Sequence, residues 1–322
     1  MAFRIFIDGE AGTTGLQIRE RLTRLPQAAS GLALISLDEE TRKNPEARLA
    51  AMREADVAVL CLPDEAAREA AEMALSLGAA APKLLDASTA HRLAPGWTYG
   101  FPELGPGQAA EIAASRLVAN PGCYATGAIA LLRPLADAGW LGPEHDVTIH
   151  GVSGYTGGGK PMIAVHEAAG GPAFELYGLS LAHKHVPEIM RHGGLARRPL
   201  FLPSVGHFPQ GMLVCIPLFL DRLNGGPTLR ALADLYAERY DQPDMRVRAH
   251  PGIFSDNLKA EAMAGTDRME IYVCGGNRDD QAVLIARLDN LGKGAAGAAI
   301  QNLGLMLNLQ EPLIGAQDRA AA

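Results

Sequence analysis

The start of the chain places the strongest constraint on the fold. An apolar stretch at residues 3–8 (FRIFID) runs directly into a turn with glycines at 9, 12 and 15, and apolar residues then recur at helical spacing. Strand, glycine turn and helix in this order are typical of a dinucleotide-binding unit. Gly9 permits the tight turn, Gly12 lets the backbone approach a pyrophosphate, and Gly15 allows close helix packing. Thr13 or Thr14 can cap the helix that faces the phosphates. The plainer alternative is an ordinary glycine-rich turn.

The alternation of strands and helices continues through the first third of the chain. Strand patterns occur at residues 32–37, 56–62, 83–87 and 117–119, and an alanine-rich helix pattern after residue 63 ends before Gly78. This predicts a parallel sheet with ligands at the carboxyl ends of its strands.

Two of those strand ends carry candidate ligand-binding groups. Beyond the second strand, Asp38 or Glu39 could accept from a ribose hydroxyl, favouring NAD, whereas Arg42 and Lys43 could pair with a 2′-phosphate, favouring NADP. The residues leave this choice open. Ser88 and Arg92 follow a later strand, where a guanidinium could bind phosphate through two hydrogen bonds. A surface ion pair is nearly as plausible for that arginine.

The second half has a different pattern. Strand patterns at 146–152, 212–220, 246–249, 269–274 and 282–288 are separated by few helices, which predicts a mainly antiparallel sheet of the kind that often forms a dimer surface. We therefore predict an α/β protein with a Rossmann-type parallel sheet domain (residues 1–120 and 290–322) and an α+β catalytic and dimerisation domain (121–289). The last helix should pack on the first domain. Asn290, in a glycine-rich loop, should touch a ligand.

The stretch NPGCYATG, residues 120–127, contains the candidate nucleophile. A strand ends at residue 119 and a helix pattern spans 127–138, so we expect Cys123 in the turn between them. A helix start stabilises an anion by roughly 0.3–1 kcal/mol, too little alone to ionise a thiol of pKa about 8.5. A histidine should therefore face the sulfur. The alternative is a buried, inert cysteine. Asn120 could bind an oxyanion or a phosphate oxygen.

Candidate partners lie further along the chain. His183, His185 and Glu188 form the motif HKHVPE, and Tyr177 precedes it. One of the histidines is the expected acid/base, with Glu188 orienting a ring or binding an amine. A metal site is disfavoured, because no third ligand has convincing spacing. The glycine loop from Ser153 to residue 160 suits an anionic group.

Composition and charge limit the classes of partner and the cellular compartment that we expect for this chain. The 322 residues carry a net charge of −7 without a basic cluster, which argues against nucleic acid. No apolar run is long enough to span a membrane, and the start of the chain is a strand rather than a signal peptide. The four cysteines show no C-x-x-C spacing and should be reduced. We expect a cytoplasmic protein.

Together, NPGCY-x-T, H-x-H-x-P-E and NLGKGA-x-GAA-x-QN resemble the N-acetyl-γ-glutamyl-phosphate reductase family of arginine biosynthesis, closest to its shorter branch and over nearly the whole chain. The resemblance implies NADPH-dependent reduction of an acyl phosphate to an aldehyde through a cysteine thioester, and a homo-oligomer, dimer or tetramer. It assigns the nucleophile to Cys123 and the acid/base to His185. Substrate residues would be Ser153, Tyr177 and Glu188, with Arg92 and Asn120 similar to phosphate-binding positions of the related aspartate-semialdehyde dehydrogenases. The glycine turn from Gly9 would bind NADP, together with Ser88 and Asn290.

Two departures and three alternatives remain. The longer branch has G-A-G-R where this chain has a glycine loop ending in Lys160, so the role of Lys160 is open, and it has proline where this chain has Ala125. A sibling enzyme acting on aspartyl phosphate would share every step. A nucleotide-sensing protein would bind NADP with an unreactive Cys123. A cysteine hydrolase or amidotransferase would leave the dinucleotide turn unexplained.

Overall fold

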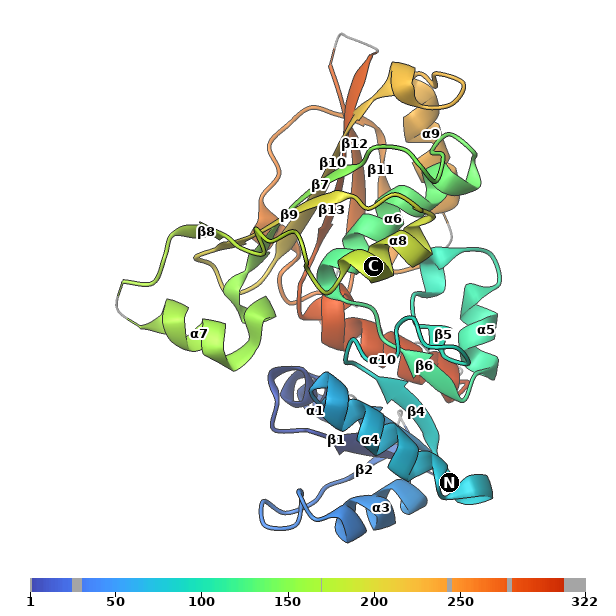
Figure 1. Cartoon of the computed structure of the whole chain (residues 1–322), viewed down its shortest axis with the longest axis vertical. Helices are drawn as coiled ribbons and strands as arrows, with labels where there is room; N and C mark the ends of the chain where they lie inside the picture. The colour runs from blue at the N-terminus through green and yellow to red at the C-terminus, as the bar shows by residue number, and fades with distance from the viewer. Residues whose placement is uncertain (1, 25–30, 169, 242–244, 277–279, 310–322) are drawn as a thin grey trace. The chain divides into compact units, whose positions relative to one another are not determined.

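The structure, a computed structural model, describes residues 2–24, 31–168, 170–241, 245–276 and 280–309. The chain divides into two compact units. Unit 1 comprises Met1–Pro121 and Ala295–Ala322, and unit 2 comprises Gly122–Gly294. The sequence-based boundaries were 120/121 and 289/290, so the structure extends the second unit through the loop that follows Asn290. Figure 1 shows the elements of each unit.

Unit 1 contains a six-stranded sheet in which every pair is parallel, as predicted. Its order is β2 (Leu32–Ile35), β1 (Phe3–Asp8), β3 (Val57–Leu60), β4 (Lys83–Asp86), β6 (Leu117–Ala119) and β5 (Thr98–Tyr99). The helices are α1 (Thr13–Arg24), α3 (Pro45–Glu54), α4 (Asp64–Leu75), α5 (Gln108–Ala114) and α10 (Gly297–Met306).

Both faces of this sheet are buried, because strand side chains alternate between two apolar clusters. On one face, Ile5 and Val59 pack with residues of α1, α5 and α10, including Ile18. On the other, Phe6 and Ala58 pack with residues of α3 and α4. The unit is therefore doubly wound, and α10 packs on the first domain as the sequence predicts (Figure 1).

Unit 2 contains a seven-stranded mixed sheet. Its order is β11 (Val247–Phe254), β12 (Met269–Cys274), β13 (Gln281–Leu288), β10 (Met212–Phe219), β7 (Thr148–Gly154), β9 (Leu200–Gly206) and β8 (Phe174–Leu176). Four pairs are antiparallel and two, β11 with β12 and β7 with β9, are parallel. The predicted mainly antiparallel sheet is confirmed.

Helices cover one face of this sheet. α6 (Cys123–Asp137) and α9 (Leu229–Arg239) pack on the strands, and α8 (Val186–Gly193) packs on α6 (Figure 1). α7 (Gly159–Glu167) follows the glycine loop. Short helical turns are η1 (Gly78–Ala80), η2 (Pro102–Leu104), η3 (Tyr155–Gly158), η4 (Leu220–Arg222), η5 (Ala260–Met263) and η6 (Gly292–Ala296). Among the described residues no helix combines the length and apolar character needed to cross a membrane.

Candidate active site

The nucleophile candidate lies at the first residue of a helix. α6 begins at Cys123, with Gly122 as its N-cap, so the predicted start at residue 127 was wrong. The sequence reading began the helix at Gly127, whereas this glycine lies inside α6. A Cβ at this position would lie 2.7 Å from Cγ2 of Val214, so glycine is needed here for α6 to pack closely on β10.

The backbone around Cys123 is held from two sides. The amide of Gly122 donates to Oε1 of Glu188 at 2.9 Å, and Glu188 is buried on α8. On the other side, a Cβ on Gly294 would lie 2.9 Å from Cβ of Cys123, so this turn lies directly against the cysteine. Cys123 itself is partly exposed. A partly exposed thiol at a helix start is the environment typical of reactive cysteines.

Tyr124, which follows the cysteine, occupies the centre of the site. Its hydroxyl donates to the carbonyl oxygen of Ser204 at 2.7 Å, and its ring lies so close to β7 that a Cβ on Gly151 would be 2.6 Å from Cε1. Burial raises the pKa of Tyr124 well above its ordinary value, and the neighbouring Tyr177 raises it further. Sequence reasoning missed Tyr124, although the residue stands in the NPGCY motif.

Tyr177 extends the same cluster. Burial, followed by the charge of Cys123, raises the pKa of Tyr177 to about 12. The phenol therefore stays protonated near neutral pH and can donate a hydrogen bond beside the sulfur. Its backbone amide donates to the carbonyl of Pro203, which continues the pairing of β8 with β9 and fixes its position.

The structure distinguishes the two histidines, which the residues alone could not. Burial, and then the charge of Lys184, lowers the pKa of His183 to about 4, against a smaller opposing effect of Glu188. The amide of His185 donates to Nδ1 of His183 at 3.1 Å, so the neutral His183 ring carries its proton on Nε2. The neutral His183 ring thus holds the backbone amide of His185 in place.

His185 is the N-cap of α8 and is buried. Its ring lies 4.8 Å from the His183 ring and 6.3 Å from the Tyr124 ring, measured between centroids. Cys123, Tyr124, Tyr177 and the two histidines thus gather in one region of unit 2. In the part of the chain that the structure describes, no three His, Cys, Asp or Glu side chains are grouped as metal ligands.

The glycine loop is tied to the same region. Ser153 is buried and donates to the carbonyl of Gly154 at 3.0 Å, and its nearby hydroxyl slightly opposes the effect of burial, which raises the pKa of Tyr124. Asn290 accepts from the amide of Gly211 at 3.0 Å and donates to Thr156 at 2.9 Å. Its amide therefore links β10 with the loop. Lys160 is exposed near the start of α7.

In unit 1, the turn from Gly9 has the form that a dinucleotide needs. Gly9 has a φ of +87°, and a Cβ there would overlap the carbonyl of Cys61. Gly12 donates to the carbonyl of Gly9 at 3.0 Å, and a Cβ on Gly15 would lie 2.5 Å from the same oxygen. The backbone cradle thus fits a pyrophosphate at the start of α1.

Two details of this unit differ from expectation. Because α1 begins at Thr13, both Thr13 and Thr14 lie in its first turn, and the residue before the helix is Gly12. Beyond β2, Arg42 forms an ion pair with Glu39 at 2.7 Å. Glu39 was considered as a ligand of the ribose hydroxyl and Arg42 as a ligand of a 2′-phosphate, and in the structure the two side chains bind each other.

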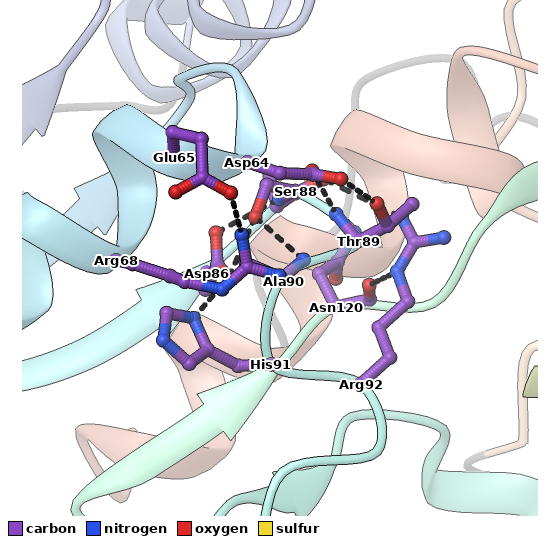
Figure 2. Close-up of polar contacts among 11 residues, drawn as sticks. Asp64, Glu65, Arg68, Asp86, Ser88, Thr89, Ala90, His91, Arg92 and Asn120 are labelled. Carbon is purple, nitrogen blue, oxygen red and sulfur yellow. Dashed lines mark hydrogen bonds and ion pairs between the residues drawn. The ribbon is translucent and has the colours of Figure 1, made fainter. Parts of the chain in front are cut away.

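Figure 2 shows the turn that carries Ser88 and Arg92. Ser88 donates its hydroxyl to Asp86 at 2.8 Å, and Nε of Arg92 donates to the carbonyl of Asn120 at 2.9 Å. The Asn120 side chain donates to Ala295 and accepts from Asn302, both at 3.0 Å. The structure thus brings together Ser88, Arg92 and Asn120 at or just beyond the carboxyl ends of β4 and β6.

Comparison with known proteins identifies the class. Residues 7–112 match the family model described as semialdehyde dehydrogenase, NAD binding domain, and residues 123–290 match the semialdehyde dehydrogenase dimerisation domain. Among solved structures, aspartate semialdehyde dehydrogenase II of Vibrio cholerae is similar with a TM-score of 0.70 and 14% identity, covering 97% of this chain and 100% of that one. The structure of the aspartate semialdehyde dehydrogenase of Candida albicans with NADP is similar with a TM-score of 0.66 and 13% identity, covering 96% of this chain and 99% of that one. The chain is an NAD(P)-dependent oxidoreductase with the fold of these dehydrogenases.

The sequence relatives are more specific. N-acetyl-γ-glutamyl-phosphate reductases of Brucella ovis and Brucella anthropi are each 51% identical over 312 residues, covering 94% of this chain and 98% of theirs. The chain belongs to the N-acetyl-γ-glutamyl-phosphate reductase family.

Proposed function

We propose that the protein catalyses the NADPH-dependent reduction of N-acetyl-γ-glutamyl phosphate to N-acetylglutamate 5-semialdehyde and phosphate, a step of arginine biosynthesis. The observation that carries this is the 51% identity with curated reductases of that name over 94% of the chain. The partly exposed Cys123 at a helix start supports it, since thioester chemistry requires such a thiol.

The coenzyme is NADP, and it supplies the hydride. The related Candida albicans dehydrogenase, whose structure was solved with NADP, supports this choice. The amides and hydroxyls of the glycine turn and the start of α1 are proposed to hold the coenzyme; these belong to Gly9, Gly12, Thr13, Thr14 and Gly15. Two further polar side chains, Ser88 and Asn290, are proposed to contact it as well.

Cys123 begins the reaction as a thiolate that attacks the acyl carbonyl carbon. Phosphate leaves, and the acyl group remains on the sulfur as a thioester. Amides at the start of α6 stabilise the oxyanion, helped by the helix dipole. Because a thiolate is a good nucleophile near neutral pH and also a fair leaving group, the aldehyde is released when the reduced adduct collapses.

His185 takes the proton of the Cys123 thiol as the thiolate forms and returns it to the sulfur when the aldehyde is released. We assign this role to His185 rather than to His183, because His183 is held neutral with Nδ1 already accepting a hydrogen bond. Tyr177 and Ser153 are proposed to contact the substrate, and Glu188 to fix the nucleophile turn through Gly122 as well as to face the substrate. The phosphoryl group is assigned to Arg92, with Asn120 supporting the guanidinium through its carbonyl.

The test is phosphate-dependent reduction of NADP by the purified protein with N-acetylglutamate semialdehyde, compared with aspartate semialdehyde. Turnover with the acetylated substrate alone is expected. A preference for aspartate semialdehyde would replace the proposal with the sibling activity. Cys123→Ser should abolish turnover while NADPH binding, followed by fluorescence, is retained, because an oxygen ester is far less prone to reduction than a thioester. Near-normal turnover by this variant would remove the thioester mechanism.

We further propose that the protein is a homo-oligomer joined through the face of the unit 2 sheet opposite α6, and that it acts in the cytoplasm, where Cys123 stays reduced. In β10 and β13, Val214 and Ala286 face α6, so alternate residues such as Cys215 and Ile285 face the other side. An apolar sheet face of this kind is typical of subunit contacts. The match to a family described as a dimerisation domain supports this.

Replacing Ile285 by Glu should therefore give a smaller species by light scattering at micromolar concentration. A matched change of the exposed Leu75 on α4 to Glu should leave the size unchanged. Equal sizes for both variants and the parent would place the contact elsewhere.

A further inference from the structure

The turn that carries Arg92 is built on one buried carboxylate. Asp86 ends β4 and is fully buried. Its Oδ1 accepts from the amide of Ser88 at 2.8 Å, and its Oδ2 accepts from the Ser88 hydroxyl at 2.8 Å and from Nδ1 of His91 at 2.6 Å (Figure 2). A buried carboxylate needs several such donors, and here they come from both ends of the turn.

A second carboxylate holds the middle of the turn. Asp64, the first residue of α4, accepts from the amide of Thr89 at 3.0 Å and from its hydroxyl (Figure 2). The amide of Ala90 donates to the hydroxyl oxygen of Ser88 at 3.0 Å. Three successive amides are thus directed at side chains of the protein. The turn is held by its amides, and recognition of an anion here falls to the guanidinium of Arg92.

Arg92 is oriented by the carbonyls of two strand ends. Its Nε donates to Asn120 at 2.9 Å, and one terminal nitrogen lies 3.5 Å from the carbonyl of Ala87. The amide of Asn120 donates in turn to the carbonyl of Asp86 at 2.7 Å, which joins the end of β6 to the end of β4. Because a guanidinium is planar, these contacts set its plane.

His91, which precedes Arg92, is fixed at two points. One edge of the ring meets Asp86, and one face stacks on Trp97 with ring centroids 4.0 Å apart and planes inclined by 14°. We propose that Asp86 and His91 are positioning residues that hold the turn so that Arg92 is pre-oriented for the phosphoryl group. This rests on the role proposed above for Arg92.

Two substitutions of one residue separate the hydrogen bond from the stacking. His91→Phe keeps an aromatic ring on Trp97 but removes the donor to Asp86. His91→Asn removes the ring but keeps an N–H near the place of Nδ1. In phosphate-dependent NADP reduction, His91→Phe should raise the KM for phosphate about fivefold, as loss of one hydrogen bond of typical strength predicts, with kcat changed less than about twofold. His91→Asn should keep the KM within about twofold of the parent.

Arg92→Lys, assayed in parallel, tests the role on which the inference depends. It should raise the KM for phosphate by about tenfold or more, because lysine cannot form the planar two-point contact. Asp137→Asn is a matched control, since Asp137 pairs with Arg133 and Arg239 near the end of α6, and it should change nothing. The alkylation rate of Cys123 by iodoacetamide, unchanged in every variant, shows that the nucleophile's unit is intact.

The outcomes are distinct. If Arg92→Lys has no effect on the phosphate KM, the assignment of phosphate to Arg92 is wrong. If it has the expected effect but His91→Phe leaves the KM within twofold, the positioning role is overturned. Equal impairment of His91→Asn and His91→Phe would also overturn it, because stacking rather than the hydrogen bond would then matter. Should His91→Phe fail to fold, Asp86→Asn takes its place, with a rise in phosphate KM of at least the same size expected and an unchanged KM counting against the proposal.

Discussion

Gly151 is predicted to be required because the Tyr124 ring occupies the space where a side chain would lie. In Gly151→Ala the new Cβ would meet Cε1 of Tyr124 at 2.6 Å and Cδ1 at 2.7 Å. Carbon atoms in contact are normally about 3.5–4.0 Å apart, so the ring must move by about 1 Å. It has little room, because Phe201 packs against it at 5.3 Å between centroids and its hydroxyl is bound to Ser204.

The size of the effect follows from three contributions. Overpacking of a buried site costs about 1–3 kcal/mol, and loss of the hydroxyl's hydrogen bond costs about 1 kcal/mol more. Replacing glycine by alanine in a strand returns roughly 0.5–1 kcal/mol of backbone entropy. The net loss of unfolding free energy is about 1–3 kcal/mol, which lowers the Tm of a unit of this size by about 3–10 °C. Cys123 precedes Tyr124, so kcat should fall as well.

A double-mutant cycle with Tyr124→Leu, followed by urea unfolding, tests the reasoning. Without the ring, Gly151→Ala should cost less than about 0.5 kcal/mol, so the coupling should be about 1–2 kcal/mol. Gly276→Ala is the control, because no atom of the described residues lies within 4 Å of a Cβ there. It should change stability by less than about 1 kcal/mol. An equal cost of Gly151→Ala in both backgrounds would refute the steric explanation.

Three further predictions concern titration and reactivity. The pKa of His183 is about 4 when folded, against an ordinary 6.5, so the unfolded chain binds a proton first. The free energy of unfolding should therefore be unaffected by His183 above about pH 6.5 and should decrease as the pH falls from 6.5 towards 4. In His183→Gln this part of the decrease should be absent when urea midpoints are measured from about pH 7.5 to 5. A difference from the parent that does not vary with pH would contradict this. Iodoacetamide at pH 7.5 should label Cys123 well before Cys215 or Cys61 by peptide mass spectrometry, because burial raises the pKa of Cys215 to about 11 and that of Cys61 higher still, with Asp86 and Asp8 contributing. Faster labelling of Cys215 would count against the assigned nucleophile. His185→Asn should lower kcat and remove one limb of the pH–rate profile, and an unchanged profile would exclude it as the acid/base.

Much of the architecture was readable from local patterns. The residues of β6 and β12 coincide with those predicted at 117–119 and 269–274. These elements have strong apolar periodicity and clear ends. β9 was missed because Pro203 interrupts its pattern, although the carbonyl of Pro203 still accepts from Tyr177. β9 forms because it pairs with β7 and β8, which the local sequence does not show.

The site was predicted less completely, because residue type does not show where a polar group is directed. Glu188 and Asn290 were expected to contact ligands, and the sequence did not show that their side chains also bind the Gly122 amide and Gly211 and Thr156. Tyr124 and His91 were missed because their hydrogen-bond partners, the carbonyl of Ser204 and the carboxylate of Asp86, are known only from the fold. Only the fold brings these groups together.

Glycines explain why Cys123 could be placed close to a helix start while the start itself was misplaced. A glycine next to polar residues indicates a ligand site or a turn, but a missing Cβ serves equally well for close packing. Gly127 and Gly294 are of the second kind, since side chains there would meet Val214 and Cys123. Cys123 is therefore oriented by backbone that lies against it and by the amide that Glu188 holds, rather than by a charged neighbour in the motif. Its reactivity must then come from groups on other elements, which is why the pH profile of His185→Asn, and not a change within NPGCY, is the sharper test of how the thiolate is made.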